Sequence, residues 1–269
     1  MITPTFHLIG LPTDCNSSFA RGPAAAPPAI RAALWSDRGN LAAEDGQEVG
    51  HDFLLEDRGD LPLVESAEDD ATIRNAVAES LSTGAIPILL GGDHAVSFPI
   101  VAAIAARHGP VNILHIDAHP DLYDDFAGNP RSHASPFARI LEAGLCRRLV
   151  QVGIRTLNRH CRERAARFGV EIVPMADFTP GKVPVLDGPL YLSLDLDGFD
   201  PSEAPGVSHP EPGGLRVREV LAVLHAQTAQ IVGADVVELN PRFDQHERTA
   251  ILAAKLVREV AATAARNLR

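Results

Sequence analysis

The residues with the clearest chemical potential lie between His115 and Asp121, where the chain reads His-Ile-Asp-Ala-His-Pro-Asp. The preceding apolar run, residues 111–114, is typical of a buried strand. On an extended chain, side chains two residues apart project to the same side, so Asp117, His119 and Asp121 can present two carboxylates and an imidazole to one point. Such a set can bind a divalent metal ion. A solvated polar strand end has the same pattern, so the rest of the chain must decide.

Three further apolar runs also end in acidic residues or in a histidine. In an open parallel sheet, ligands bind at the carboxyl ends of the strands, so side chains that follow several strands can meet at one site. Four such endings in one chain favour a shared site over coincidence. The three further endings are Asp93 with His94, Asp195 with Asp197, and Asp235 with Glu238.

The candidate ligands are four carboxylates and two imidazoles. They are more than one four-coordinate zinc ion needs, and they lack the thiolates of structural zinc sites. Two divalent ions that share bridging carboxylates would use them all, and oxygen-rich ligation with some imidazole suits Mn²⁺ and permits Co²⁺ or Fe²⁺. Two ions roughly 3.5–4 Å apart can lower the pKa of a shared water and supply hydroxide near neutral pH, which predicts a hydrolase. The six candidates are His94, Asp117, His119, Asp121, Asp195 and Asp197.

Strands and helices are predicted to alternate along the chain. Because this order produces a parallel sheet with right-handed crossovers, we expect a three-layer α/β/α fold around a central, mostly parallel sheet of about eight strands. The expected strands are residues 6–10, 49–55 at an edge, 86–90, 111–114, 149–153, 170–173, 190–194 and 231–239. The expected helices lie near residues 30–35, 71–82, 97–108 with Ser97 as its cap, 135–143, 159–168, 217–224 and 251–260.

Length and composition predict one soluble domain that spans residues 1–269. The chain has 24 basic and 35 acidic residues, and its net charge of −11 argues against nucleic acid or an anionic membrane as a partner. The three cysteines lack the spacing of a disulfide framework or of a thiolate zinc site, so we expect them to be reduced. No basic segment with a long apolar run starts the chain, and no run reaches membrane-spanning length. We therefore expect a cytoplasmic protein.

Four motifs, in this order along essentially the whole chain, resemble the ureohydrolase family, which includes arginases and agmatinases. They are Gly91–His94, Asp117–Asp121, Ser193–Pro201 and Asp235–Pro241. Three shorter stretches are most similar to the plant-type arginase branch of that family. These are Asn16–Phe19, Ser132–Ser135 and Gly206–His209.

The resemblance implies a role for each matching residue. His94 and Asp121 would bind one Mn²⁺, His119 and Asp197 would bind a second, and Asp117 and Asp195 would bridge the two ions. The tetrahedral intermediate would be stabilised by the metals and by Asp121.

Two further matches concern the substrate and its protons. Glu238 would bind the substrate guanidinium, a role that suits a carboxylate facing a planar cation. His133 would also contact the substrate and relay protons, because the pKa of imidazole lies near neutral pH. Asp93 is expected to orient a metal-bound histidine rather than to bind metal. The role of His209 stays open.

Two departures from the family concern the rest of the substrate. Ala134 stands where the family often has glycine, and the loop between Asp121 and His133 differs from that of animal arginases. Hydrogen-bond donors in three loops, residues 16–21, 123–132 and 155–159, could bind an α-carboxylate. Of these donors, Asn129 is our choice of substrate contact. Asp124 and Asp125 could instead hold an α-ammonium group. The other donors are Asn16, Ser17, Ser18, Arg131 and Asn158.

These observations predict a di-manganese amidinohydrolase that releases urea from a small cationic guanidino substrate. L-arginine, giving L-ornithine, is our first choice of substrate, and the alternatives are agmatine, giving putrescine, and another guanidino acid. A metal-dependent deacetylase would use one metal and a donor tyrosine, for which the chain offers only Tyr123 and Tyr191. A catalytically inactive regulatory homologue is disfavoured because every expected ligand is present. By resemblance, a homotrimer or homohexamer is expected.

Overall fold

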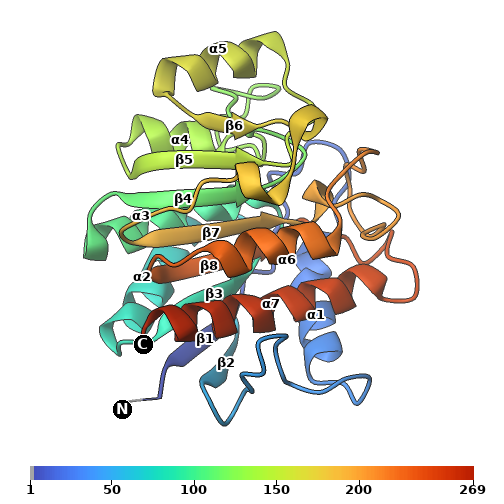
Figure 1. The fold of residues 1–269 in the computed structure, drawn as a ribbon. Helices are drawn as coiled ribbons and strands as arrows, with labels where there is room; N and C mark the ends of the chain where they lie inside the picture. The colour runs from blue at the N-terminus through green and yellow to red at the C-terminus, as the bar shows by residue number, and fades with distance from the viewer. Residues whose placement is uncertain (1–2) are drawn as a thin grey trace.

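All eight strands of the central sheet run parallel, in the order β2-β1-β3-β8-β7-β4-β5-β6 (Figure 1). The computed structural model describes residues 3–269. The strands are β1 Thr5–Gly10, β2 Leu54–Asp60, β3 Ile86–Leu90, β4 Val111–Ile116, β5 Cys146–Val152, β6 Glu171–Val173, β7 Leu190–Asp195 and β8 Ile231–Val237. The predicted α/β sheet of about eight strands is therefore confirmed.

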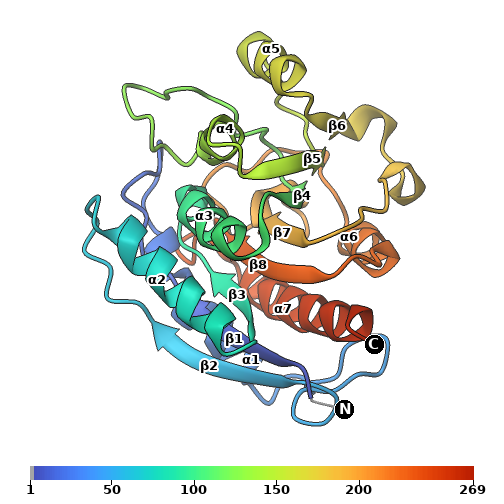
Figure 2. The ribbon, with the colours of Figure 1, turned by 90° about the vertical axis from the view of Figure 1, so that its left-hand side faces the viewer.

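Helices cover both faces of the sheet, and Figure 2 shows α2 and α3 on the side opposite to α6 and α7. The helices are α1 Ala26–Leu34, α2 Asp69–Ser82, α3 Ser97–His108, α4 Pro136–Glu142, α5 Arg159–Phe168, α6 Val217–Ala226 and α7 Arg248–Asn267. Apolar residues of α1, α6 and α7 share one core cluster with the sheet, and those of α2, α3, α4 and α5 share a second. Within residues 3–269, no helix has both the length and the apolar character needed to cross a membrane.

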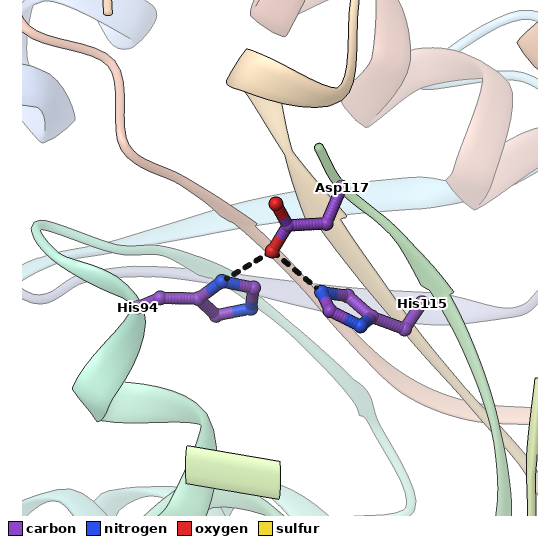
Figure 3. Close-up of side chains that lie close together, drawn as sticks. All are labelled: His94, His115 and Asp117. Carbon is purple, nitrogen blue, oxygen red and sulfur yellow. Dashed lines mark hydrogen bonds and ion pairs between the residues drawn. The ribbon is translucent and has the colours of Figure 1, made fainter. Parts of the chain in front are cut away.

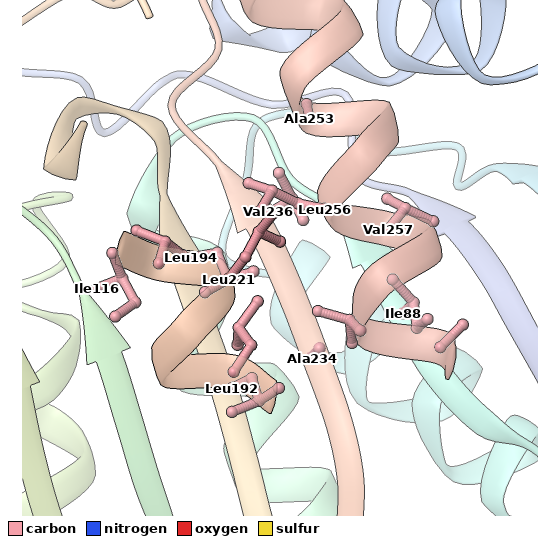
Figure 4. Packing of buried hydrophobic residues seen from close by; sticks show 14 of the residues in the cluster. Ile88, Ile116, Leu192, Leu194, Leu221, Ala234, Val236, Ala253, Leu256 and Val257 are labelled. Atoms are coloured by element: carbon pink, nitrogen blue, oxygen red, sulfur yellow. The ribbon is translucent and has the colours of Figure 1, made fainter. Parts of the chain in front are cut away.

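The central strands are buried on both faces, which is typical of parallel sheets. Every residue of β4, β7 and β8 is buried. Figure 4 shows Leu192, Leu194 and Val236 of these strands packed with Leu256 and Val257 of α7. Full burial of one such side chain stabilises the fold by roughly 1.5–3 kcal/mol. The adjacent strands β3, β8, β7 and β4 therefore form a rigid base, and their carboxyl ends lie side by side.

The edge strand β2 differs from its prediction. We expected residues 49–55, but β2 begins at Leu54, and its residues pair with β1 from Thr5 opposite Leu54 to Gly10 opposite Asp60. Most of β2 is polar and exposed. Charged residues are common on sheet edges because they discourage pairing with other chains. Backbone pairing with β1, rather than an apolar pattern, thus decides where this strand lies.

Candidate active site

Three of the four central strands, β3, β4 and β7, bring all six predicted metal ligands to the carboxyl edge of the sheet. His94 follows β3. Asp117, His119 and Asp121 follow β4. Asp195 is the last residue of β7, and Asp197 lies two residues after it. The turn after β3 needs Gly92, because a Cβ atom at this position would lie 1.7 Å from the carbonyl oxygen of Thr13. Five of the six candidate ligands are buried, and the His119 side chain is 30% exposed.

Three carboxylates surround one nitrogen of His94. Its Nδ1 lies 3.2 Å from Oδ2 of Asp117, 3.1 Å from Oδ2 of Asp121 and 3.0 Å from Oδ2 of Asp195. Burial lowers the pKa of His94, but the three carboxylates outweigh it and raise that pKa well above its ordinary value. For Asp195, burial and the negative charges of Asp197 and Asp117 act together and raise the pKa well above its ordinary value. A positive charge at this cluster, from a proton or a bound cation, would therefore be stabilised.

A second group forms around His119 and shares Asp117 with the first. Nδ1 of His119 lies 3.4 Å from Oδ1 of Asp117 and 3.2 Å from Oδ2 of Asp197. Asp117 thus directs one oxygen toward each histidine, which is the geometry of a bridging ligand. Asp195 directs only Oδ2 toward His94, because its Oδ1 accepts a hydrogen bond of 2.8 Å from the backbone nitrogen of Asp197. A bridging role for Asp195 stays a prediction.

A buried network behind His94 determines which of its nitrogens carries the proton. Asp235, at the centre of β8, accepts hydrogen bonds from Ser97, Tyr191 and Ser193. Since the one proton of the Ser193 hydroxyl goes to Asp235, its oxygen accepts from Nε2–H of His94 at 2.9 Å. When Nδ1 of His94 carries no proton, its lone pair faces three carboxylate oxygens, an arrangement that fits a divalent cation between them.

This network corrects one expectation and adds to the argument against a deacetylase. Ser97 does not cap α3, but is its first residue and uses its hydroxyl on Asp235 at 2.5 Å. The hydroxyl of Tyr191 is buried and donates to the same carboxylate, so Tyr191 cannot serve as the donor tyrosine of a deacetylase.

Our sequence reasoning gave no role to His115, which lies beside His94 and Asp117 in Figure 3. Gln151 donates to Nδ1 of His115 at 3.0 Å, so Nε2 carries the proton and donates to Oδ2 of Asp117 at 2.8 Å. Phe137 packs on the ring, with ring centroids 3.9 Å apart. His115 is thus built to orient Asp117. Its position two residues before Asp117 was the only signal in the sequence.

Glu238 and His133 form a pair beside the metal ligands. Oε1 of Glu238 accepts from Nδ1 of His133 at 2.8 Å and from the backbone nitrogen of His94 at 2.9 Å. Burial raises the pKa of Glu238, but the nearby His133 outweighs it and leaves that pKa below its ordinary value. Asp121 and Glu238 have positive φ angles of 50° and 64°. Such conformations are costly for residues other than glycine, and they are typical of functional sites.

A cavity of about 220 Å³ opens beside these groups. His209, which we had left undecided, lines it, and its ring centroid lies 5.2 Å from that of His133 and 6.0 Å from that of His119. Within residues 3–269, Nε2 of His209 is buried without a hydrogen-bond partner. The other lining residues are Ser18, His119, Pro120, Asp121, Tyr123, Phe126, His133, Ala134, Thr156, Cys161, Asp195, Asp197 and Glu238.

Asn129 is not among the residues that line the cavity. Its side-chain nitrogen donates to Oδ1 of Asn16 at 3.0 Å, and its side-chain oxygen accepts from the backbone nitrogen of Arg131 at 2.8 Å. Two other polar residues expected near the substrate are also engaged. Arg131 pairs with Asp70, and Asp124 pairs with Arg164 at 2.7 Å.

Asp93 lies in a different place from the one we expected. It accepts hydrogen bonds from the backbone nitrogens of Asn16 and Ala95, at 2.9 and 3.1 Å, and not from the His94 ring. Burial, together with the charge of Glu238, raises the pKa of Asp93 to about 7. Asp93 therefore anchors the loop that follows β1, while Ser193 orients the His94 ring.

Comparison with known proteins agrees with this geometry. The family model "Arginase family" matches residues 4–263. Arginase 1, mitochondrial, from Arabidopsis thaliana is 49% identical over 95% of this chain and 80% of its own length. The structure of arginase from Medicago truncatula superposes with a TM-score of 0.92 at 43% identity, and covers 97% of this chain and 88% of its own. The mitochondrial agmatinase of Gallus gallus is 34% identical over 94% of this chain and 78% of its own length.

These names also show that the expected cytoplasmic location is wrong. The Arabidopsis relative above and other plant arginases of 45–47% identity are named as mitochondrial or chloroplastic, which points to an organelle. Composition and hydropathy do not specify a compartment, so the expectation of a cytoplasmic protein had no physical basis that could exclude an organelle.

Proposed function

The chain belongs to the arginase family, and on that premise we propose that it hydrolyses L-arginine to L-ornithine and urea. It is a hydrolase that acts on C–N bonds of amidines, like the rest of its family. The choice of arginine is supported by greater similarity to proteins named arginase than to the agmatinase. The hydrolysis of agmatine to putrescine is the alternative.

We further propose that two Mn²⁺ ions bind at the two clusters. His94, Asp117, Asp121 and Asp195 would hold one ion, and His119, Asp197 and the shared Asp117 would hold the other. The environment of the His94 ring carries this proposal. Its Nδ1 lies within 3.0–3.2 Å of three carboxylate oxygens, and its Nε2 donates to the hydroxyl of Ser193. When bound, the ions would lower the pKa of a water and supply hydroxide near neutral pH.

The side chains of the cavity account for the remaining chemistry. Oε1 of Glu238 is already shared by His133 and His94, so Oε2 would accept from the substrate guanidinium. Hydrolysis adds water at the guanidinium carbon and breaks the bond from this carbon to the nitrogen of the substrate chain. Both protons of the water end on that departing nitrogen. His133 would supply one of them, and Asp121 would stabilise charge at the tetrahedral carbon.

Recognition of the rest of the substrate would involve His209 and Ser18, which line the cavity. His209 has a polar nitrogen without a partner within the described residues, and Ser18 is exposed at the mouth of the cavity. A substrate contact by Asn129 would require it to exchange its bonds to Asn16 and Arg131. We propose residues 1–269 as one ureohydrolase domain that acts as a homotrimer or homohexamer.

A substrate panel tests the proposal. Urea release is measured with L-arginine, agmatine and other guanidino acids as parallel substrates of the Mn²⁺-loaded protein. We expect the highest kcat/KM for L-arginine, because buried donors that match an α-carboxylate are left unpaired by agmatine. A higher kcat/KM for agmatine would support the alternative substrate and leave the metal proposal intact.

A further inference from the structure

Ser18 contacts the ring of His133, and both residues line the cavity. Its hydroxyl oxygen lies 2.8 Å from Nε2 of His133, and its backbone nitrogen donates to the same Nε2 at 3.1 Å. His133 is buried, whereas Ser18 is exposed and lines the cavity. The two residues are 115 positions apart in the chain, so this contact exists only in the folded protein.

The backbone contact determines the tautomer of His133 when its ring is neutral. A backbone N–H can only donate, so Nε2 must offer a lone pair when this bond is made. The proton of neutral His133 then sits on Nδ1, where it is donated to Oε1 of Glu238 at 2.8 Å. Nε2 is consequently the nitrogen at which His133 gains and loses its second proton, and the Ser18 hydroxyl is its neighbour there.

The loop that carries Ser18 is held in place by several bonds. Asp93 accepts from the backbone nitrogen of Asn16 at 2.9 Å, and the carbonyl oxygen of Asn16 accepts from the backbone nitrogen of His133 at 3.2 Å. At the end of the loop, Oδ2 of Asp14 accepts from the backbone nitrogen of Gly22 at 2.6 Å. The position of Ser18 therefore follows from a built structure around it and not from a chance approach of an exposed side chain.

We propose that the hydroxyl of Ser18 relays protons between Nε2 of His133 and the cavity. This inference rests on the proposed hydrolysis of a guanidino substrate. In the relay, Nε2–H of cationic His133 passes its proton to the serine oxygen, while the serine passes its own hydroxyl proton to the departing nitrogen or to a water. One O–H bond breaks as another forms, so Ser18 is unchanged. In the reverse direction, the same hydroxyl reloads His133 from solvent.

Two opposing influences on His133 suit this exchange. Burial lowers the pKa of His133, but the negative charges of Glu238, Asp93 and Asp121 outweigh it and raise that pKa to about 9. The backbone N–H of Ser18 acts in the other direction, because it donates to the nitrogen that would take the proton. The backbone N–H of Ser18 therefore positions His133 and favours loss of the Nε2 proton, whereas the negative charge of Glu238 favours its retention.

Ser18→Ala removes the hydroxyl and keeps the backbone N–H, so it separates the relay from the backbone contact. We expect kcat to fall by roughly 10–100-fold, within the range for losing part of a general acid–base system, while the metal content stays that of the wild type. Ser18→Thr keeps a hydroxyl and should retain most of kcat. The matched control is Ser82→Ala, because Ser82 is exposed, its hydroxyl donates to the backbone carbonyl of Glu79 at 2.7 Å, and it does not line the cavity.

Two readouts distinguish a relay from a merely structural role. Rising concentrations of imidazole buffer should restore kcat of Ser18→Ala, because a small acid can replace the missing hydroxyl in the exposed mouth. The solvent isotope effect on kcat should increase in that variant and not in Ser82→Ala. A kcat of Ser18→Ala equal to that of the wild type, or a loss that buffer does not reverse, would overturn the relay. Wild-type protein that releases no urea from any guanidino substrate would instead overturn the proposed function.

Discussion

Replacement of Ser193 by alanine is expected to weaken metal binding, although Ser193 is not a candidate ligand. Its hydroxyl donates to Oδ1 of Asp235 at 2.8 Å and accepts from Nε2 of His94 at 2.9 Å. All three side chains are buried. The variant therefore leaves a buried imidazole N–H without an acceptor, and it frees the His94 ring from the tautomer that directs the Nδ1 lone pair toward the carboxylates.

The size of the effect follows from these contacts. Loss of the bond to the Asp235 carboxylate should cost about 1.5–3 kcal/mol of unfolding free energy, and the unpaired Nε2–H of His94 about 1–3 kcal/mol more. Metal affinity should fall by about 10–100-fold, as for other groups that orient a metal-bound histidine. Ser97→Ala is the matched control, because Ser97 donates to the same carboxylate at 2.5 Å. It should lose only the first of these contributions and keep the affinity for metal.

The measurement has two parts. Calorimetric titration of metal-free protein with Mn²⁺ gives the affinities of the wild type and of both variants. Urea-induced unfolding of the same metal-free samples gives their stabilities. If Ser193→Ala and Ser97→Ala bind Mn²⁺ equally well, then Ser193 does not orient His94 for a metal, and our reasoning about the tautomer is refuted.

Removal of metal by a chelator should abolish urea release and Mn²⁺ should restore it; full activity in a preparation that holds one ion or none per chain would contradict the two-metal proposal. His133→Asn should lower kcat by roughly 10²–10⁴-fold with two metals still bound. Because the pKa of His133 is raised to about 9, its proton is present below that pH, so wild-type kcat should decline above about pH 9 and this decline should be absent in His133→Asn. Asp195→Asn should lower metal content and activity together. Asp93→Asn should affect both less, since Asp93 with a pKa of about 7 is partly protonated already and binds only backbone nitrogens; the opposite ranking would count against the ligand set.

The sequence was sufficient to predict the parallel sheet and the gathering of ligands at its edge. Apolar periodicity is a local property, and it marked β3, β4, β7 and β8 within a few residues of their observed ends. Spacing of two residues singled out Asp117, His119 and Asp121 as a group, but the expected extended segment is not present, because β4 ends at Ile116 and Asp121 has a positive φ. Because parallel strands present their carboxyl ends at a common edge, the residues that follow different strands were expected to meet there. The polar strand β2 lacked such a pattern, so its position was predicted wrongly.

Contacts between distant parts of the chain could be seen only in the folded molecule. Ser193 reaches His94 across 99 positions, and Ser18 reaches His133 across 115. Such hydrogen bonds depend on strand order and on the path of each loop, and the spacing of neighbouring residues predicts neither of these. The types and order of the candidate metal ligands were thus determined by the sequence itself. The tautomer of each histidine, the engagement of Asn129 away from the cavity and the proximity of Ser18 to His133 were decided by tertiary structure, because a hydrogen bond requires both partners to meet in space.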